Sequence, residues 1–316
     1  MYRFMLAMGL ALVAAIPAPG ADYQKGVAAY QQGDYSTALR ELKELAQQND
    51  PAAQTTLGHM YYEGQGVDQS YAEALKWYQK AADQGSAEAQ TEIGGMHFDG
   101  RGVEQNYTEA ARWYRKAADQ GLAEARFELG TMYYDGQGVS KDLEEAARWY
   151  NKAADQGLPE AQYELAHMYF DGQGVTQSYP EAAKWYKKAA DQGLAEAQYE
   201  LGNLYYEGQG VEQDYEEAAD RYREAADQGL AVAQFELGNL YMDGQGVNQD
   251  DVEAVKWYRK AAEQDLPEAQ FELGNLYADG RGVARDIAEA EKWYQKAAEQ
   301  GYPDAQERLD ELKKGK

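Results

Sequence analysis

Residues 195–230 read AEAQYELGNLYYEGQGVEQDYEEAADRYREAADQGL, and close copies of this stretch follow one another along most of the chain. The interval between copies is 36 residues, as the tryptophans show at positions 77, 113, 149, 185, 257 and 293. Arg221 occupies the position, between Trp185 and Trp257, at which this spacing would place a further tryptophan. Self-similarity at a fixed period of about 20 to 50 residues is typical of repeat proteins. The period therefore predicts a stack of seven similar units.

Each copy predicts two helices. Over 195–207, apolar residues recur at helical spacing, on a face that carries Ala197, Leu201, Leu204 and Tyr205. The segment Gly208-Gln209-Gly210 then ends this helix, because glycine adopts the left-handed conformation found at helix ends. A second helix follows over 215–228. One such pair cannot bury its apolar face alone, whereas stacked pairs can.

The composition excludes some classes of partner. The chain has 316 residues, with 55 Asp and Glu against 30 Lys and Arg, and its formal net charge is −25. Nucleic acids and anionic membrane surfaces are bound through basic footprints, so we expect neither as a partner. The acidic excess favours a protein or peptide partner that is basic, through long-range steering.

The first residues predict export. A short basic start, Met1-Tyr2-Arg3, precedes an apolar run from Phe4 to Ile16 and small residues up to Ala21. This order is typical of a secretory signal peptide, here residues 1–21. A membrane span needs about 20 apolar residues, so an uncleaved anchor is the second alternative. The mature protein is then periplasmic or secreted. It has no cysteine, and we expect a monomer without disulfides.

The repeated residues resemble the Sel1-like repeat family, which is related to tetratricopeptide repeats. The resemblance rests on Ala, Leu-Gly and Tyr in the first helix, the Gly-x-Gly-Val loop, and Trp-Tyr and Ala-Ala-x-x-Gly in the second, over about 51–305. It implies an all-α fold, a right-handed superhelical α/α solenoid of antiparallel helix pairs. It also implies a non-catalytic scaffold for protein–protein interaction. Departures from the pattern are His97, Ala166, Arg221 and Asp265.

The domain organisation follows from the repeats. We expect a divergent, tetratricopeptide-like helix pair over 22–50, seven 36-residue repeats over 51–302 and a polar capping helix over 303–316. Terminal repeats of a solenoid are commonly atypical, since only one side is covered by a neighbour.

The resemblance also indicates where a partner would bind, because the first helix of each pair lines the concave groove of tetratricopeptide-like solenoids. Counted from Ala195 and its equivalents, the second, fifth, ninth, twelfth and thirteenth positions face inward, and the second is mostly Glu. The fifth carries rings: Phe127, Tyr163, Tyr199, Phe235 and Phe271. The ninth carries amides: Asn203, Asn239 and Asn275. The twelfth carries Tyr134, Phe170 and Tyr206, and the thirteenth Asp135, Asp171, Glu207 and Asp243.

These residue types suit a basic peptide. Rings supply contact area, amides bond a peptide backbone, and carboxylates select Lys and Arg. The alternative is structural, with the rings packed between adjacent first helices and the carboxylates merely solvated. A clamp for a C-terminal carboxylate is not expected in this groove, because inward lysines are missing.

No catalytic or cofactor chemistry is expected. The three histidines, His59, His97 and His167, form no motif that binds metal, and the glycine loops lack the lysine of a phosphate loop. A β-lactamase-like hydrolase needs Ser followed three residues later by Lys, which no serine here provides. The recurrent Glu four residues before each Trp is expected to support the second helix. The leading hypothesis is a scaffold, the first alternative is a binder of cell-wall, peptidoglycan-type fragments, and the β-lactamase-like hydrolase is the least favoured alternative.

Overall fold

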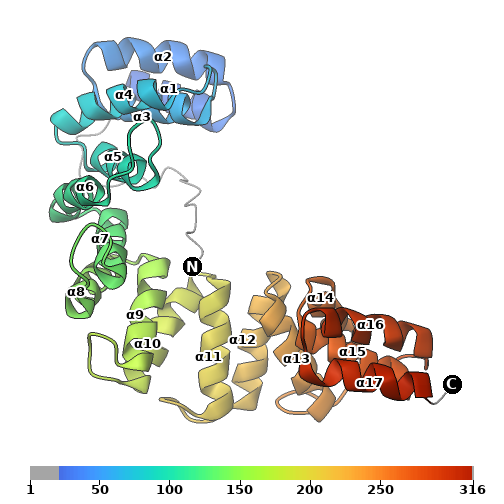
Figure 1. Ribbon diagram of the computed structural model, residues 1–316. Helices are drawn as coiled ribbons and strands as arrows, with labels where there is room; N and C mark the ends of the chain where they lie inside the picture. The colour runs from blue at the N-terminus through green and yellow to red at the C-terminus, as the bar shows by residue number, and fades with distance from the viewer. Residues whose placement is uncertain (1–20, 315–316) are drawn as a thin grey trace. The chain divides into compact units, whose positions relative to one another are not determined.

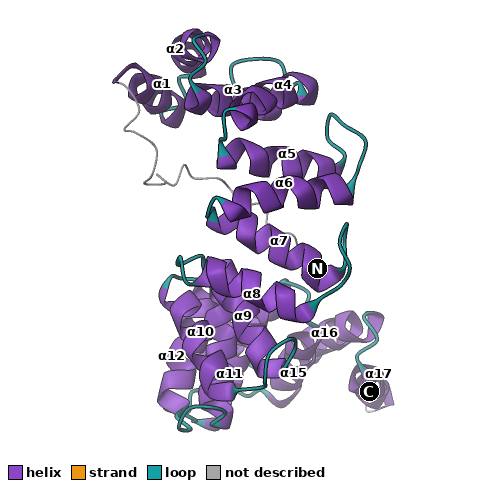
Figure 2. Cartoon of the chain, turned by 90° about the vertical axis from the view of Figure 1, so that its left-hand side faces the viewer, coloured by secondary structure: helices purple, strands orange, loops and turns teal. Residues whose placement is uncertain are grey.

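The computed structural model describes residues 21–314, which form helices joined by loops and contain no strand (Figures 1 and 2). The predicted all-α fold of paired helices is confirmed. The predicted signal peptide lies almost wholly outside the described residues. None of the helices within 21–314 is both long and apolar enough to cross a bilayer. The helices are α1 Ala21–Gln31, α2 Tyr35–Gln47, α3 Pro51–Glu63, α4 Tyr71–Asp83, α5 Ala87–Asp99, α6 Tyr107–Asp119, α7 Ala123–Asp135, α8 Leu143–Ala154, α9 Pro159–Asp171, α10 Tyr179–Asp191, α11 Ala195–Glu207, α12 Tyr215–Asp227, α13 Ala231–Asp243, α14 Asp251–Glu263, α15 Pro267–Asp279, α16 Ile287–Glu299 and α17 Pro303–Lys314.

The protein divides into two compact units, one up to Lys141 and one from Asp142. The first contains α1 to α7 and the second α8 to α17. Within each unit, every helix packs against the next one in sequence. We call the odd-numbered helices first helices and the even-numbered ones second helices. Repeats 1 to 7 begin with α3, α5, α7, α9, α11, α13 and α15, and positions are counted from the first residue of these helices.

The second helices begin at capping side chains. The residue before each second helix from α4 to α16 is Ser, Asn or Asp. Its side-chain oxygen accepts the backbone N–H of the third helical residue, as Asp142 does from Glu145 at 3.0 Å. That third residue is the recurrent glutamate. It pairs with a cation three or four residues later, as Glu181 does with Lys184 at 3.0 Å. Both interactions favour the helical start, so the structural role expected for this glutamate is supported.

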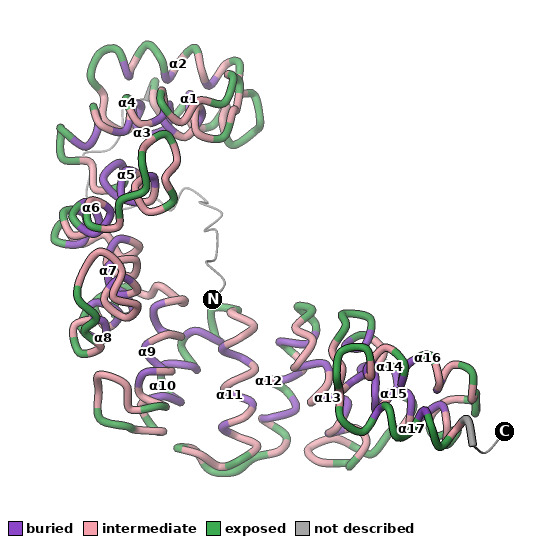
Figure 3. Tube along the Cα trace, viewed as in Figure 1, coloured by how far each residue is buried: buried purple, intermediate pink, exposed green. Residues whose placement is uncertain are grey.

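A buried tyrosine joins the first and second helices of a repeat. Tyr258 of α14 is 3% exposed, and its ring lies 2.7 Å from the point where a Cβ on Gly238 of α13 would stand. Glycine at this eighth position therefore lets the ring lie directly on the backbone of the first helix. Repeat 4 has Ala166 here, and this residue is fully buried. Figure 3 shows buried segments along both first and second helices.

A buried glutamine at the fourth position joins consecutive repeats. Gln234 Nε2 donates to the carbonyl oxygen of Ala226 at the end of α12, at 3.0 Å. Its Oε1 accepts from Gln264 Nε2, just after α14, at 2.8 Å. The same two bonds are made by Gln54, Gln90, Gln162, Gln198 and Gln270. Each of these glutamines thus connects two successive second helices through the first helix between them.

Candidate protein-binding face

The fifth-position rings lie on the buried tyrosine of their own repeat. Ring centroids are 5.8 Å apart for Tyr163 and Tyr186, 5.8 Å for Tyr199 and Tyr222, and 5.6 Å for Phe235 and Tyr258. Phe271 lies between Tyr294 and Tyr302 and is only 8% exposed. Phe127, Tyr163, Tyr199 and Phe235 are half-buried. These four rings keep an accessible edge, whereas Phe271 belongs to the core.

The ninth-position amides are held in a repeated network. Asn203 Oδ1 accepts the hydroxyl of Tyr222 at 2.7 Å, and its Nδ2 donates to Glu200 Oε2 at 3.2 Å. Asn239 and Asn275 make the equivalent bonds in repeats 6 and 7. Each amide therefore orients a carboxylate, and only one of its N–H groups is left for a bound backbone.

The carboxylates in this network are at the sixth position, which the sequence pattern alone did not single out. Glu200, Glu236 and Glu272 are half-buried on the same helix face as the rings. Burial raises the pKa of Glu200 and of Glu236, and the hydrogen bond from asparagine opposes that rise. Their recurrence in α11, α13 and α15, three helices without any Lys or Arg, could have revealed them.

The twelfth-position rings cover the start of the second helix. Phe170 meets Tyr179 edge to face with centroids 5.2 Å apart, and Tyr206 meets Tyr215 at the same distance. Tyr206 also donates its hydroxyl to Gln245 Oε1 at 3.1 Å. In the first unit, Lys141 Nζ lies 5.5 Å from the ring centroid of Tyr134. These rings support the loops beside the first-helix face.

Several acidic groups on the first-helix face have no basic partner among the described residues. Asp171, Glu207 and Asp243 are exposed, and Asp135 is half-buried. Within residues 142–314, no ion pair is formed by the second- and sixth-position glutamates Glu160, Glu196, Glu200, Glu236, Glu268 and Glu272. Glu160 and Glu268 each have a buried carboxylate oxygen without a hydrogen-bond partner among the described residues. The face therefore carries negative charge that a cation could neutralise.

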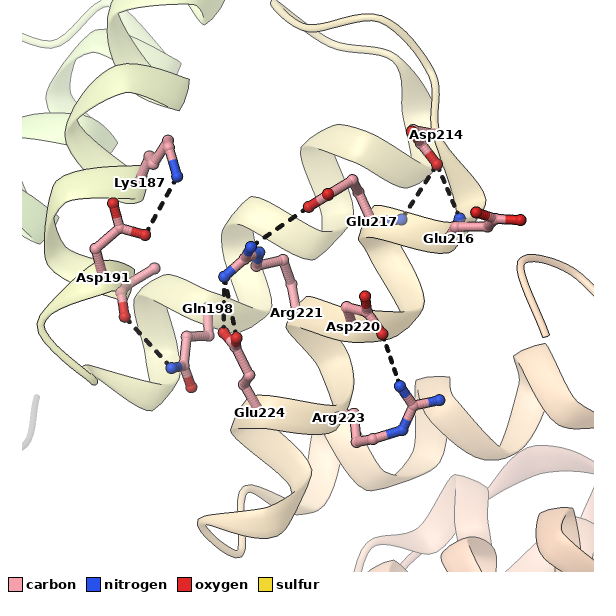
Figure 4. Close-up of polar contacts among 11 residues, drawn as sticks. Lys187, Asp191, Gln198, Asp214, Glu216, Glu217, Asp220, Arg221, Arg223 and Glu224 are labelled. Carbon is pink, nitrogen blue, oxygen red and sulfur yellow. Dashed lines mark hydrogen bonds and ion pairs between the residues drawn. The ribbon is translucent and has the colours of Figure 1, made fainter.

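The second-helix face has the opposite character. Lys188 Nζ lies 3.7 Å from the ring centroid of Trp185, and Lys260 Nζ lies 3.6 Å from that of Trp257. In α12 the tryptophan is replaced by Arg221, whose guanidinium binds Glu224 at 2.9 Å and Glu217 at 3.4 Å (Figure 4). Because Trp185 and Trp257 are at most 9% exposed, this face presents Lys and Arg rather than rings.

The ninth position also holds two histidines in contrasting environments. Burial lowers the pKa of His59, but the carboxylate of Glu92, with Oε1 3.6 Å from Nε2, and the charges of Glu88 and Glu63 together outweigh burial and leave the pKa raised. Burial lowers the pKa of His167, and the charge of Asp171 opposes that without outweighing it. His167 lies against the rings of Tyr163 and Tyr186, at centroid distances of 4.6 Å and 5.3 Å.

We expect the two histidines to titrate on opposite sides of 6.5, the ordinary value. The raised pKa of His59 contributes stability that is present below pH 6.5 and lost as the pH rises through its folded-state pKa. The lowered pKa of His167 contributes stability that is present above pH 6.5 and lost as the pH falls through its folded-state pKa. An NMR titration of the imidazole protons, assigned with His59→Asn and His167→Asn, measures both. Two midpoints on the same side of 6.5 would contradict this assignment.

Asparagine is a suitable replacement because repeats 5 to 7 already carry it at this position, bonded to the buried tyrosine. Comparing urea unfolding of each variant with the native protein at two pH values then isolates each histidine. Among residues 21–314, no group of three or more His, Asp or Glu is placed to hold a metal ion.

The family model of the Sel1 repeat matches seven consecutive segments: 51–86, 87–122, 123–158, 159–194, 195–230, 231–266 and 267–302. The chain belongs to the Sel1 repeat family. Sel1-repeat proteins generally act as scaffolds for protein interaction, and their fold is typically non-enzymatic.

Two solved Sel1-type structures are similar to this one. A protective antigen from uropathogenic Escherichia coli strains, which displays an SLR fold, is 38% identical with a TM-score of 0.84, over 87% of this chain and 59% of that chain. The present sequence therefore spans less than two thirds of that protein's length. A Sel1 repeat protein from Oxalobacter formigenes is 34% identical with a TM-score of 0.70, over 93% of this chain and 91% of that chain. No curated protein matches the sequence.

Proposed function

We propose that this Sel1-repeat protein is a non-catalytic scaffold that binds a basic segment of a partner protein on its first-helix face. The observation that carries the proposal is the separation of charge within the repeats of the second unit. Second-helix cations are paired with acids or lie on tryptophan, as Lys184 and Lys188 do. The first-helix glutamates Glu200, Glu236 and Glu272 have no cationic partner among the described residues. A ligand cation would supply the missing charge and the missing hydrogen bonds.

The binding residues fall into two groups. The sixth-position carboxylates would bind the cations, oriented by the asparagines, in the pairs Glu200 with Asn203, Glu236 with Asn239 and Glu272 with Asn275. The half-buried rings of Tyr163, Tyr199 and Phe235 would pack against the aliphatic parts of the ligand. A lysine stem can lie on such a ring while its ammonium reaches a carboxylate. Partly buried carboxylates attract a cation more strongly than fully solvated ones, because less water screens them.

The test uses a fluorescein-labelled peptide of alternating lysine and serine, and a second peptide with glutamate in place of lysine. We expect the native protein to bind only the lysine peptide, with affinity that falls as salt rises. The combined change Glu200→Gln, Glu236→Gln and Glu272→Gln should weaken binding at least about tenfold, the effect of losing about 1.4 kcal/mol. Glutamine keeps an oxygen that accepts the asparagine N–H, so the fold should persist.

The matched control removes the same charge from the second helices, through Glu181→Gln, Glu216→Gln and Glu253→Gln. Equal weakening by both sets of changes would mean that net charge, and not this face, governs binding. Affinity that ignores salt and extends to peptidoglycan fragments would instead favour a binder of cell-wall fragments. Affinity capture with the native protein and the first-helix variant, from the extract of its own cells, then identifies the natural partner.

We also propose that this scaffold works outside the cytoplasm, with residues 1–21 as a cleaved signal peptide. The support is the order of a basic start, an apolar run and small residues in the sequence. Cell fractionation and the N-terminal sequence of the purified protein test it. A protein that is retained in the cytoplasm with its first residues intact would contradict it.

A further inference from the structure

Repeat 7 departs from the other repeats at several positions that meet in one pocket. The pocket has a volume of about 420 Å³, lies within the second unit and is lined by residues of α15, α16 and α17 and by Met242 of α13. Its lining includes Ala278, Arg281, Arg285 and Ile287 from repeat 7 and Arg308 from α17. It is therefore built largely from residues that differ from the repeat pattern.

The space arises because two rings are absent. In repeats 4 and 5 a twelfth-position ring, Phe170 or Tyr206, meets the tyrosine that begins the next helix, with centroids 5.2 Å apart. In repeat 7 the corresponding residues are Ala278 and Ile287. Smaller side chains at both places leave the volume that the rings occupy elsewhere.

The positive charge arises from a change in the same loop. In repeats 5 and 6, Gln213 and Gln249 donate Nε2 to the twelfth-position carbonyl oxygen at 2.8 and 3.0 Å. Arg285 replaces this glutamine and makes the equivalent bond through Nε, to the carbonyl oxygen of Ala278 at 2.9 Å. The two terminal nitrogens of the guanidinium take no part in that hydrogen bond. Among the described residues, no carboxylate lies within ion-pair distance of Arg285.

The two other arginines at the pocket are each paired with a carboxylate. Arg281 binds Asp251 through two nitrogens, at 2.8 and 3.0 Å. Arg308 donates to Glu311 at 3.1 Å. Glu272 accepts from the neutral amide of Asn275 and has no cationic partner among the described residues, and Asp279 is exposed to solvent, which screens its charge. Within residues 21–314, Arg285 is thus the cation at this pocket that lacks an anionic partner.

We propose that this pocket binds a carboxylate group of a peptide, held by the guanidinium of Arg285 beside an apolar wall that includes Leu276 and Leu312. A planar guanidinium offers parallel N–H donors that match the two oxygens of a carboxylate. The carboxylate could belong to a peptide C-terminus or to an Asp or Glu side chain. The site borders the acidic first-helix face, because Glu272 and Asn275 of that face also line the pocket, but it selects an anion through Arg285 where that face selects a cation.

The experiment follows the arginine Nε–H signals of the full-length protein by NMR as three short peptide probes are added. The probes are acetyl-Leu-Leu with a free carboxylate, its amidated twin, and amidated acetyl-Leu-Glu. We expect the free acid to bind and the amidated twin not to bind. Binding of the glutamate probe as well would assign the site to any carboxylate, and its failure would assign the site to a peptide C-terminus. None of the probes carries a lysine, so the result is independent of the proposed function.

Two variants connect the binding to the pocket. Arg285→Gln restores the residue of most other repeats. It should weaken binding of the free-acid probe about tenfold, as expected for the loss of a charge-assisted bidentate contact. Ala278→Tyr should fill the pocket and abolish binding. The matched control is Lys141→Gln, which makes the same cation-to-glutamine change at the equivalent loop position of repeat 3. Equal affinity for acid and amide, or full affinity in Arg285→Gln, overturns the proposal.

Discussion

Replacing Gln234 by leucine is expected to lower the free energy of unfolding by about 3 kcal/mol, because two buried polar groups lose their partners at once. The carbonyl oxygen of Ala226 loses the N–H it accepts at 3.0 Å, and Gln264 Nε2 loses its acceptor at 2.8 Å. Gln234 is only 4% exposed, so water does not replace either bond without opening the contact between repeats. Urea unfolding followed by circular dichroism measures the loss.

The protein provides its own intermediate case for this prediction. In repeat 3 the same position is Arg126, whose Nε donates to the carbonyl oxygen of Ala118 at 3.2 Å. Gln234→Arg should therefore keep the donated hydrogen bond and lose the accepted one. Its free energy of unfolding should fall by about half as much as that of Gln234→Leu. Equal losses for leucine and arginine would show that shape, and not hydrogen bonding, decides the stability at this position.

Replacing Gly246 by alanine is expected to cost about 3 kcal/mol, from two additive causes. Its φ is +66°, a left-handed conformation that costs an L-residue about 1–2 kcal/mol. In addition, the new Cβ would stand 1.9 Å from the carbonyl oxygen of Tyr215, at the start of α12. The loop after α13 must then move away from the preceding repeat. Urea unfolding gives the total, and hydrogen exchange in the first turn of α12 reports the local opening.

Gly229→Ala separates the two causes. Gly229 also has a positive φ, +97°, but a Cβ there would meet nothing within 4 Å. We expect a loss of only about 1 kcal/mol, since the left-handed strain is partly offset by the reduced freedom of the unfolded state. A loss as large as that of Gly246→Ala would mean that the contact between the loop and α12 contributes nothing.

The candidate site was only partly predictable from the sequence. The period of 36 places Tyr163, Tyr199 and Phe235 on one side of the first helices, and the structure leaves these rings half-buried. Phe271 occupies the same position but is buried, because Tyr302, just before α17, lies against it with centroids 5.0 Å apart. A residue's place in the repeat fixes its direction, whereas its exposure depends on what the neighbouring element covers.

The asparagines show a second limit of what could be predicted from the sequence. Their spacing indicates an amide in every late repeat, and an amide suggests contact with a ligand backbone. Asn203 instead receives the hydroxyl of Tyr222 from the adjacent helix and orients Glu200. Hydrogen-bond partners that lie 19 residues apart in the sequence meet only once the two helices have packed. The functional group exposed by this network is the carboxylate, which the repeat pattern alone does not distinguish from other surface glutamates.

The sequence by itself determined the repeat, its two helices, the loop that joins them and the family to which the protein belongs, because these depend on local spacing, helix caps and small residues at fixed positions. The tertiary structure decided which polar groups are already satisfied and which are not. Gln234, Asn239 and Glu236 are all polar residues of α13. Gln234 connects α12 to the residue after α14, Asn239 binds a tyrosine hydroxyl, and Glu236 has no cationic partner among the described residues. That difference arises from the partners that packing brings within hydrogen-bond distance, and those partners are far away in the sequence.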